Sequence, residues 1–270
     1  MNTQNTLPSS SAEEAKIALS VEHLSVTYDQ TQVLWDVSFS VPEGHLVAIV
    51  GPNGAGKSTL IKALLGFVQP VGGAIRFYGA PHKNMVGEIG YVPQRESVDW
   101  HFPITVEELV LMGRYGKLSP LQRIREADRE AAKRYLSLVQ LEPFAHRQIS
   151  QLSGGQQQRA FLARALMQEA SIYFLDEPLA GIDHTSELLI MDLLHKLSRE
   201  GKTLFVVHHD LESVKTYYDW AILLNAHLVA CGSIDQAFTT ENLRKTYGRH
   251  FGLLEEAQLT AKQIHGGRGV

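Results

Sequence analysis

The clearest chemistry in this sequence lies in a glycine-rich stretch that ends in a lysine and two hydroxyl side chains. Its nine residues are Gly51, Pro52, Asn53, Gly54, Ala55, Gly56, Lys57, Ser58 and Thr59. They match the pattern G-x-x-x-x-G-K-[ST], in which backbone N–H groups curl around phosphate oxygens and a following helix adds its positive end. We expect Lys57 to contact the β- and γ-phosphates of a nucleoside triphosphate and Ser58 to bind Mg²⁺. A simple glycine-rich turn is the alternative, and the apolar strand predicted just before the loop argues against it.

Two carboxylates follow another apolar run further along the chain. Asp176 and Glu177 come directly after residues 172–175, Ile-Tyr-Phe-Leu. An acid at the carboxyl end of a parallel strand lies in the crevice where nucleotides bind, so we expect Asp176 to hold Mg²⁺. Glu177 is then placed to orient and deprotonate the attacking water as a general base. By itself such a pair is more often the solvated end of a strand. The glycine-rich loop upstream favours the functional interpretation.

A serine, two glycines and a glutamine open a predicted helix. Ser153 and Gln156 have the spacing of a capping box, so the run Leu-Ser-Gly-Gly-Gln at 152–156 could be no more than a helix start. The same run resembles the signature motif of the ABC ATPases. That resemblance implies that Ser153 and the N–H groups of Gly154 and Gly155 close over the γ-phosphate of ATP held by the phosphate loop of a second copy of the chain.

Three further positions resemble ABC ATPase elements and occur in the family's order. Tyr28 resembles the aromatic residue that stacks on adenine, with a half-buried strand tyrosine as the alternative. Gln94 resembles the glutamine that senses Mg²⁺ and the attacking water at the junction with the helical lobe. Asp183 stands in the place of the aspartate in the loop after the acidic pair. The family usually has Ser or Asn where this chain has Ala180 or Gly181.

Two adjacent histidines, His208 and His209, are candidates for the family's switch histidine. That histidine is directly followed by an acidic residue, which here is Asp210, and is usually preceded by Thr or Ser. The resemblance therefore selects His209 and gives His208 the preceding position. An imidazole near the γ-phosphate would stabilise charge that develops during transfer. A metal site at His-His-Asp is the minor alternative, because the sequence positions no third and fourth ligands.

Strand and helix patterns supply the elements that must position these residues. Residues 17–41 alternate as an antiparallel β segment, with Val33, Trp35, Val37, Phe39 and Val41 predicted on one face. Buried parallel strands are predicted at 46–50, 171–175 and 203–207, and a helical pattern covers about 105–168. Together with the resemblance, which spans about residues 21–232, these patterns predict an α/β fold. It combines a P-loop NTPase core built on a parallel sheet, an N-terminal antiparallel β subdomain and an inserted α-helical lobe.

Composition sets the outer limits of the interpretation. The 270 residues carry a formal charge of −4 and a single cysteine, Cys231. No basic tract indicates a nucleic-acid partner, and no intrachain disulfide is possible. No apolar run approaches the ~20 residues that span a bilayer, so a membrane role requires a partner. We expect a disordered tail at 1–16, one ATPase domain at 17–250 with the helical lobe at about 96–168, and a second tail at 251–270.

The cargo is inferred from the stretch after Gln94. Residues 97–103 and 111–116 look like the corresponding parts of ATPases from bacterial manganese, zinc and iron importers, where much of this region touches the permease. The resemblance implies an ATPase at the cytoplasmic face of the membrane, an integral membrane permease, and indirectly an extracytoplasmic metal-binding protein. The alternatives are a siderophore, haem or cobalamin importer, and a soluble ABC ATPase of iron–sulfur assembly. A mechanical ABC ATPase would usually carry two cassettes or a long coiled coil, and the sequence has neither.

Overall fold

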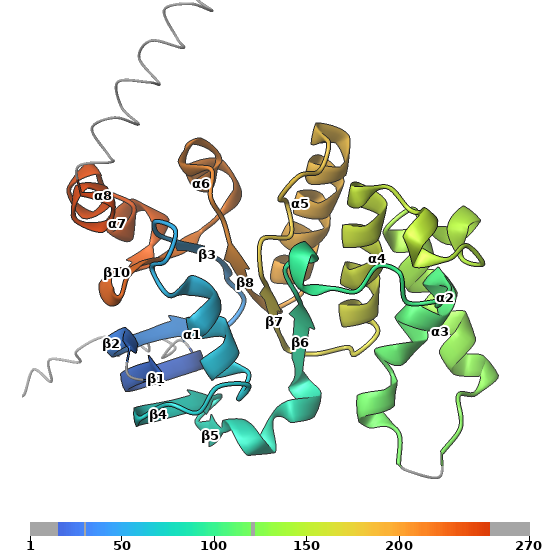
Figure 1. The fold of residues 1–270 in the computed structure, drawn as a ribbon, viewed down its shortest axis with the longest axis horizontal. Helices are drawn as coiled ribbons and strands as arrows, with labels where there is room; N and C mark the ends of the chain where they lie inside the picture. The colour runs from blue at the N-terminus through green and yellow to red at the C-terminus, as the bar shows by residue number, and fades with distance from the viewer. Residues whose placement is uncertain (1–15, 30, 120–121, 249–270) are drawn as a thin grey trace, which may run out of the picture.

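The computed structural model describes residues 16–29, 31–119 and 122–248, and it contains two β-sheets (Figure 1). The smaller sheet is antiparallel, with the order β2-β1-β4-β5; its strands are β1 (Ile17–Tyr28), β2 (Thr31–Pro42), β4 (Gly72–Phe77) and β5 (Ala80–Pro81). The larger sheet has the order β10-β9-β3-β8-β7-β6. Its strands are β3 (Leu46–Val50), β6 (Ile89–Val92), β7 (Ile172–Leu175), β8 (Thr203–Val207), β9 (Trp220–Asn225) and β10 (His227–Ser233). All but β10 run parallel to their neighbours.

Helices cover both faces of the larger sheet. The helix α1 (Lys57–Leu64) lies between the two sheets, and α4 (Gly154–Leu166) and α5 (His184–Arg199) lie on the opposite face (Figure 1). Beyond α4 are α2 (Val106–Met112) and α3 (Glu126–Leu138). Three short helices follow in the last part of the described chain: α6 (Leu211–Tyr217), α7 (Ile234–Ala237) and α8 (Thr240–Tyr247).

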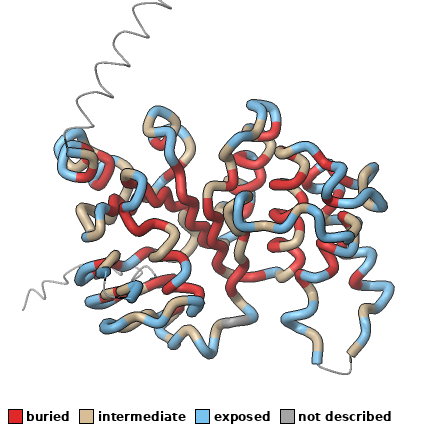
Figure 2. Tube along the Cα trace, in the orientation of Figure 1, coloured by how far each residue is buried: buried red, intermediate tan, exposed pale blue. Residues whose placement is uncertain are grey.

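The central strand β3 shows how the two faces divide the core. Val47 and Ile49 pack toward α1 and the smaller sheet, whereas Leu46, Ala48 and Val50 pack toward α4 and α5. Every residue of β3 is buried, and buried segments run through the middle of the molecule (Figure 2). A strand covered on both faces has no polar positions, which explains the uninterrupted apolar run in the sequence. The strand therefore forms a rigid base for the loop that follows it.

The predicted face of β2 is wrong at its beginning. Leu34 is buried, and Trp35 is 47% exposed. The pairing with β1 shifts at this point, where Asp36 has a left-handed backbone with φ 47°. Such a β-bulge inserts one extra residue and transfers the side chains before it to the other face of the sheet. The alternation seen from Val37 onward consequently does not extend back to Val33 and Trp35.

The predicted α/β fold, with its antiparallel β part and inserted helices, is confirmed. Between β6 and β7 the chain forms α2, α3 and α4, which pack together at one end of the molecule (Figure 1). Within the described ranges, no helix combines the length and the apolar composition needed to cross a membrane. The predicted tails lie outside the described residues apart from Lys16, as do residues 249 and 250 of the predicted domain.

Candidate nucleotide-binding site

The glycine-rich loop leaves the carboxyl end of β3 and enters α1 through a close contact on each side. A Cβ atom on Gly51 would lie 2.0 Å from the carbonyl oxygen of Leu224 in β9, and one on Gly56 would lie 2.5 Å from Cδ2 of Leu34. Gly56 also precedes α1 with a left-handed φ of 92°. Both positions therefore require glycine, for lack of space and, at Gly56, for its backbone conformation. The bulge in β2 contributes directly, because it turns Leu34 inward against the loop.

The side chain of Lys57 lies across the opening of this loop. Its Nζ donates hydrogen bonds to the carbonyl oxygens of Gly51 at 2.8 Å and Pro52 at 3.0 Å, and the residue is only 6% exposed. Burial lowers the pKa of the Lys57 ammonium, while the nearby carboxylates of Glu177 and Asp176 oppose that shift. Two backbone carbonyl oxygens therefore hold the Lys57 ammonium at the opening of the loop.

Asp176 lies behind the loop at the end of β7. Its Oδ1 accepts a hydrogen bond from Ser58 Oγ at 3.2 Å, and the residue is 2% exposed. Burial raises the pKa of Asp176, and the hydrogen bond from Ser58 partly offsets this. A hydroxyl and a carboxylate form the hard-oxygen donor set that suits Mg²⁺. The structure thus brings together two of the residues predicted to bind that ion.

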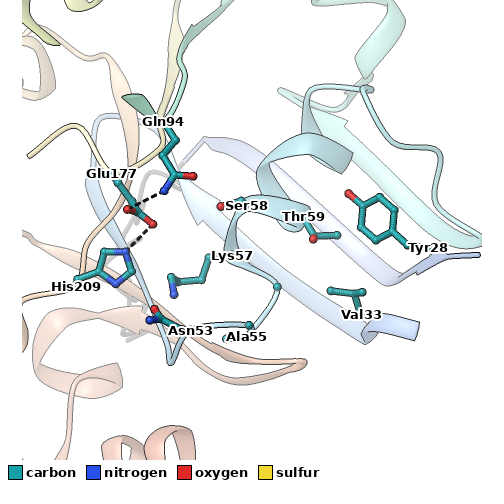
Figure 3. A pocket seen from close by; sticks show the side chains of 12 residues that line it. Tyr28, Val33, Asn53, Ala55, Lys57, Ser58, Thr59, Gln94, Glu177 and His209 are labelled. Atoms are coloured by element: carbon teal, nitrogen blue, oxygen red, sulfur yellow. Dashed lines mark hydrogen bonds and ion pairs between the residues drawn. The ribbon is translucent and has the colours of Figure 1, made fainter. Parts of the chain in front are cut away.

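Glu177 is held by two side chains that approach from different elements. Gln94, just after β6, donates from Nε2 to Glu177 Oε2 at 3.1 Å, and His209, just after β8, lies with Nε2 2.6 Å from Glu177 Oε1 (Figure 3). Glu177 itself has a left-handed backbone with φ 53°. For a residue other than glycine this conformation costs about 1–3 kcal/mol. The conformation directs the carboxylate into the cavity beside Lys57.

The two adjacent histidines have different environments. His209 is exposed and points into the site, whereas His208 is buried with its Nε2 2.7 Å from Ser213 Oγ. Its ring packs against Tyr218 with the ring centroids 5.3 Å apart, and burial lowers the pKa of His208. Of the two histidines, His209 is therefore the one that lies in the cavity, as predicted. His208 instead anchors the segment after β8 through its contacts with Ser213 and Tyr218.

One cavity of about 930 Å³ collects most of the predicted residues. Residues 53–59 form its wall together with Tyr28, Val33, Gln94, Glu177 and His209. Tyr28 and Val33 lie at one end, Glu177 and His209 at the other, and Lys57 between them (Figure 3). Val33 was missed as a site residue, because the alternation of β2 predicted it on the buried face. Its place beside Tyr28 on one hairpin was the available signal.

The signature motif lies elsewhere. Ser153 caps α4, since its Oγ accepts from Gln156 N at 3.3 Å while Gln156 Oε1 accepts from Ser153 N at 2.9 Å. A Cβ on Gly155 would lie 2.7 Å from Ser186 Oγ in α5, which explains that glycine. Among the residues that the structure describes, none of the four at 153–156 lines the cavity. The capping box predicted for the helix start is therefore present, and one chain does not bring the motif to the phosphate loop.

Known proteins share both the sequence and the fold. The ABC transporter family matches residues 34–180. The manganese transport system ATP-binding protein MntB of Bacillus subtilis is 52% identical over 239 residues, covering 88% of this chain and 96% of that protein. The zinc transport system ATP-binding protein TroB of Treponema pallidum is 48% identical over 231 residues, covering 86% and 87%. A nucleotide-free ATP-binding cassette from an ABC transporter matches with a TM-score of 0.72 at 26% identity, covering 85% and 94%. On this similarity and the motifs in its cavity, the chain belongs to the ABC transporter family.

Proposed function

We propose that this chain is the ATP-hydrolysing subunit of an ABC importer for a transition metal ion, namely manganese, iron or zinc. The observation that carries the proposal is the convergence of Lys57, Glu177, Gln94 and His209 on one cavity. The cargo is supported by relatives whose names specify manganese and zinc transport. These relatives are about 50% identical to the chain, which favours a metal ion over a chelate as the cargo and transport over iron–sulfur assembly.

The lining of the cavity favours one orientation of ATP, with the phosphates at the glycine-rich loop and the adenine at Tyr28. The triphosphate would lie against the N–H groups of residues 53–59, where the positive end of α1 adds to the charge of Lys57. The adenine would then reach Tyr28 and Val33 at the opposite end of the cavity. Tyr28 is 41% exposed, which leaves its ring face available for stacking.

Mg²⁺ would be held by Ser58 and Asp176, with Gln94 nearby, and would neutralise phosphate charge. Glu177 accepts a proton from the attacking water as the water oxygen bonds to the γ-phosphorus. The bond from that phosphorus to the β–γ bridging oxygen breaks, which releases ADP and inorganic phosphate. Before ATP binds, His209 and Gln94 hold the carboxylate of Glu177. When the γ-phosphate enters, His209 can turn its N–H toward the charge that develops there.

A complete site requires a second copy of the chain. The motif at 153–156 projects its N–H groups from the start of α4 but lies outside the cavity. Two copies facing each other would place this motif of one copy over the phosphate loop of the other. ATP would then join the two copies and hydrolysis would release them, which moves the permease. Through the permease the chain would sit at the cytoplasmic face of the membrane and serve an extracytoplasmic metal-binding protein.

The test combines hydrolysis with transport. Purified protein should release phosphate from ATP, and a strain lacking the gene should lose uptake of manganese, iron or zinc. Wild-type protein should restore uptake, and the Lys57→Ala variant should not. Normal uptake of all three metals in the deletion strain, measured alongside active ATP hydrolysis by the purified chain, would exclude metal import while leaving the ATPase assignment intact.

A further inference from the structure

Arg95 directly follows Gln94 and connects it to the start of the signature helix. Its Nε donates a hydrogen bond to Gln157 Oε1 at 3.2 Å, across 62 residues of sequence. Gln157 is 5% exposed, and its Nε2 donates to the carbonyl oxygen of Ile149 at 3.2 Å. The amide of Gln157 is thus fixed at both ends, so its oxygen is a rigid acceptor for the guanidinium.

The guanidinium also lies against the signature motif itself. A Cβ on Gly154 would lie 3.3 Å from Cζ of Arg95, which is tighter than most real contacts. Gly154 therefore leaves room for this arginine. Within the described part of the chain, Arg95 has no carboxylate at ion-pair distance, and α4 has no acidic residue in its first turn. A cation beside the positive end of a helix gains nothing from the helix dipole. The hydrogen bond and the packing explain its position better than charge attraction does.

The backbone on either side of Arg95 is fixed as well. The carbonyl oxygen of Arg95 accepts a hydrogen bond from Trp100 Nε1 at 2.9 Å, and the Trp100 ring packs edge-on against Phe161 of α4 with the centroids 5.2 Å apart. From the same helix, Arg164 donates from Nη2 to the carbonyl oxygen of Tyr91 at 3.1 Å. The helix α4 is therefore attached to the segment that carries Gln94 both before and after that residue.

We propose that Arg95 is a positioning residue that couples the two half-sites carried by one chain: through its bond to Gln157 it holds Gln94 against Glu177 in one half-site and keeps the signature motif of the other in register. This inference rests on the proposed ATPase function. Gln94 reaches Glu177 directly, at 3.1 Å, so a displacement of the Arg95 backbone moves the side chain that orients the catalytic carboxylate. Arg95 does not line the cavity and acts only through its neighbours.

The first test separates positioning from binding. In Arg95→Ala we expect kcat for ATP to fall about 10- to 100-fold, because small misplacements at a reacting centre cost rates of that order. KM for ATP should change less than about twofold, since the residue touches no nucleotide. Arg76→Ala, an exposed arginine on β4, is the matched control and should keep wild-type kinetics. An unchanged kcat in Arg95→Ala, or a loss confined to KM, would overturn the proposal.

The second test concerns the bond itself. Gln157→Ala should lower kcat as Arg95→Ala does, and the double variant should lie within about twofold of the single variants, because both remove one interaction. The exchanged pair Arg95→Gln with Gln157→Arg restores a guanidinium–amide bond and should recover kcat at least partly. Multiplying effects in the double variant, or no recovery in the exchanged pair at a wild-type melting temperature, would refute the coupling. A wild-type chain without ATP hydrolysis would instead refute the proposed function.

Discussion

The phosphate loop and the signature motif both lie at a helix start and are both proposed to bind phosphate, yet they are held in different ways. At the loop, backbone packing leaves no freedom, because Gly51 lies against Leu224 and Gly56 against Leu34. At the signature motif, side chains do the holding through the Ser153–Gln156 cap and the Arg95–Gln157 bond. We infer that the phosphate loop, with Glu177 and His209 beside it, forms a fixed half that is proposed to bind nucleotide, and that the signature motif forms a second half that is proposed to serve another copy of the chain.

The largest effect should come from the fixed half. Glu177→Gln removes the general base and should lower kcat about 10²–10⁴-fold. ATP binding should persist, since the amide keeps the shape of the side chain. Phosphate release and binding of a fluorescent ATP analogue measure the two effects, with the exposed Glu22→Gln on β1 as the control. Near-normal hydrolysis in Glu177→Gln would remove Glu177 from its assigned role.

The histidine pair allows a sharper comparison within the same half. His209→Ala should lower kcat about 10²- to 10³-fold, the usual loss when one donor to developing charge is removed. His208→Ala should mainly lower the melting temperature, because it leaves Ser213 without its buried partner. Kinetics per folded molecule and thermal melting distinguish them. The reverse pattern would assign the catalytic role to His208.

Backbone packing at the loop predicts an intolerance that a surface glycine does not share. Gly51→Ala places a methyl group 2.0 Å from the Leu224 carbonyl oxygen, so the loop must shift. We expect ATP affinity to fall at least about tenfold and the free energy of unfolding to drop by about 1–3 kcal/mol. Gly72→Ala, where a Cβ meets nothing within 4 Å, is the control. Equal stability and affinity in the two variants would show that the loop is not held by packing.

A smaller effect is expected at the far end of the cavity. Tyr28→Ala removes a stacking partner worth about 0.5–1.5 kcal/mol, so KM for ATP should rise about 2- to 12-fold with kcat nearly unchanged. Tyr28→Phe keeps the ring and should behave as wild type. If KM for ATP is unaffected by Tyr28→Ala, Tyr28 is a strand tyrosine without a role in nucleotide binding.

Much of the fold and most residues of the fixed half could be predicted, because both are encoded in patterns of residues close together in the sequence. The loop at 51–59 and the acidic pair each occupy a few consecutive residues at the end of an apolar strand. The side of the sheet on which Val33 lies could not be predicted. It depends on the bulge at Asp36, whose left-handed backbone conformation does not follow from the residue type. The Arg95–Gln157 bond was equally invisible, because it joins residues brought together only by the packing of α4 on the loop after β6.

The most direct measurement mixes two inactive variants. Ser153→Arg damages only the signature motif and Lys57→Ala only the phosphate loop, so each alone should hydrolyse almost no ATP. In a mixture, subunits that pair at random would restore about a quarter of the sites, each formed by Lys57 of one copy and Ser153 of the other. Recovery of hydrolysis toward that level is the predicted result. A mixture as inactive as its components, with mixed dimers shown to form, would contradict a nucleotide site shared between two copies.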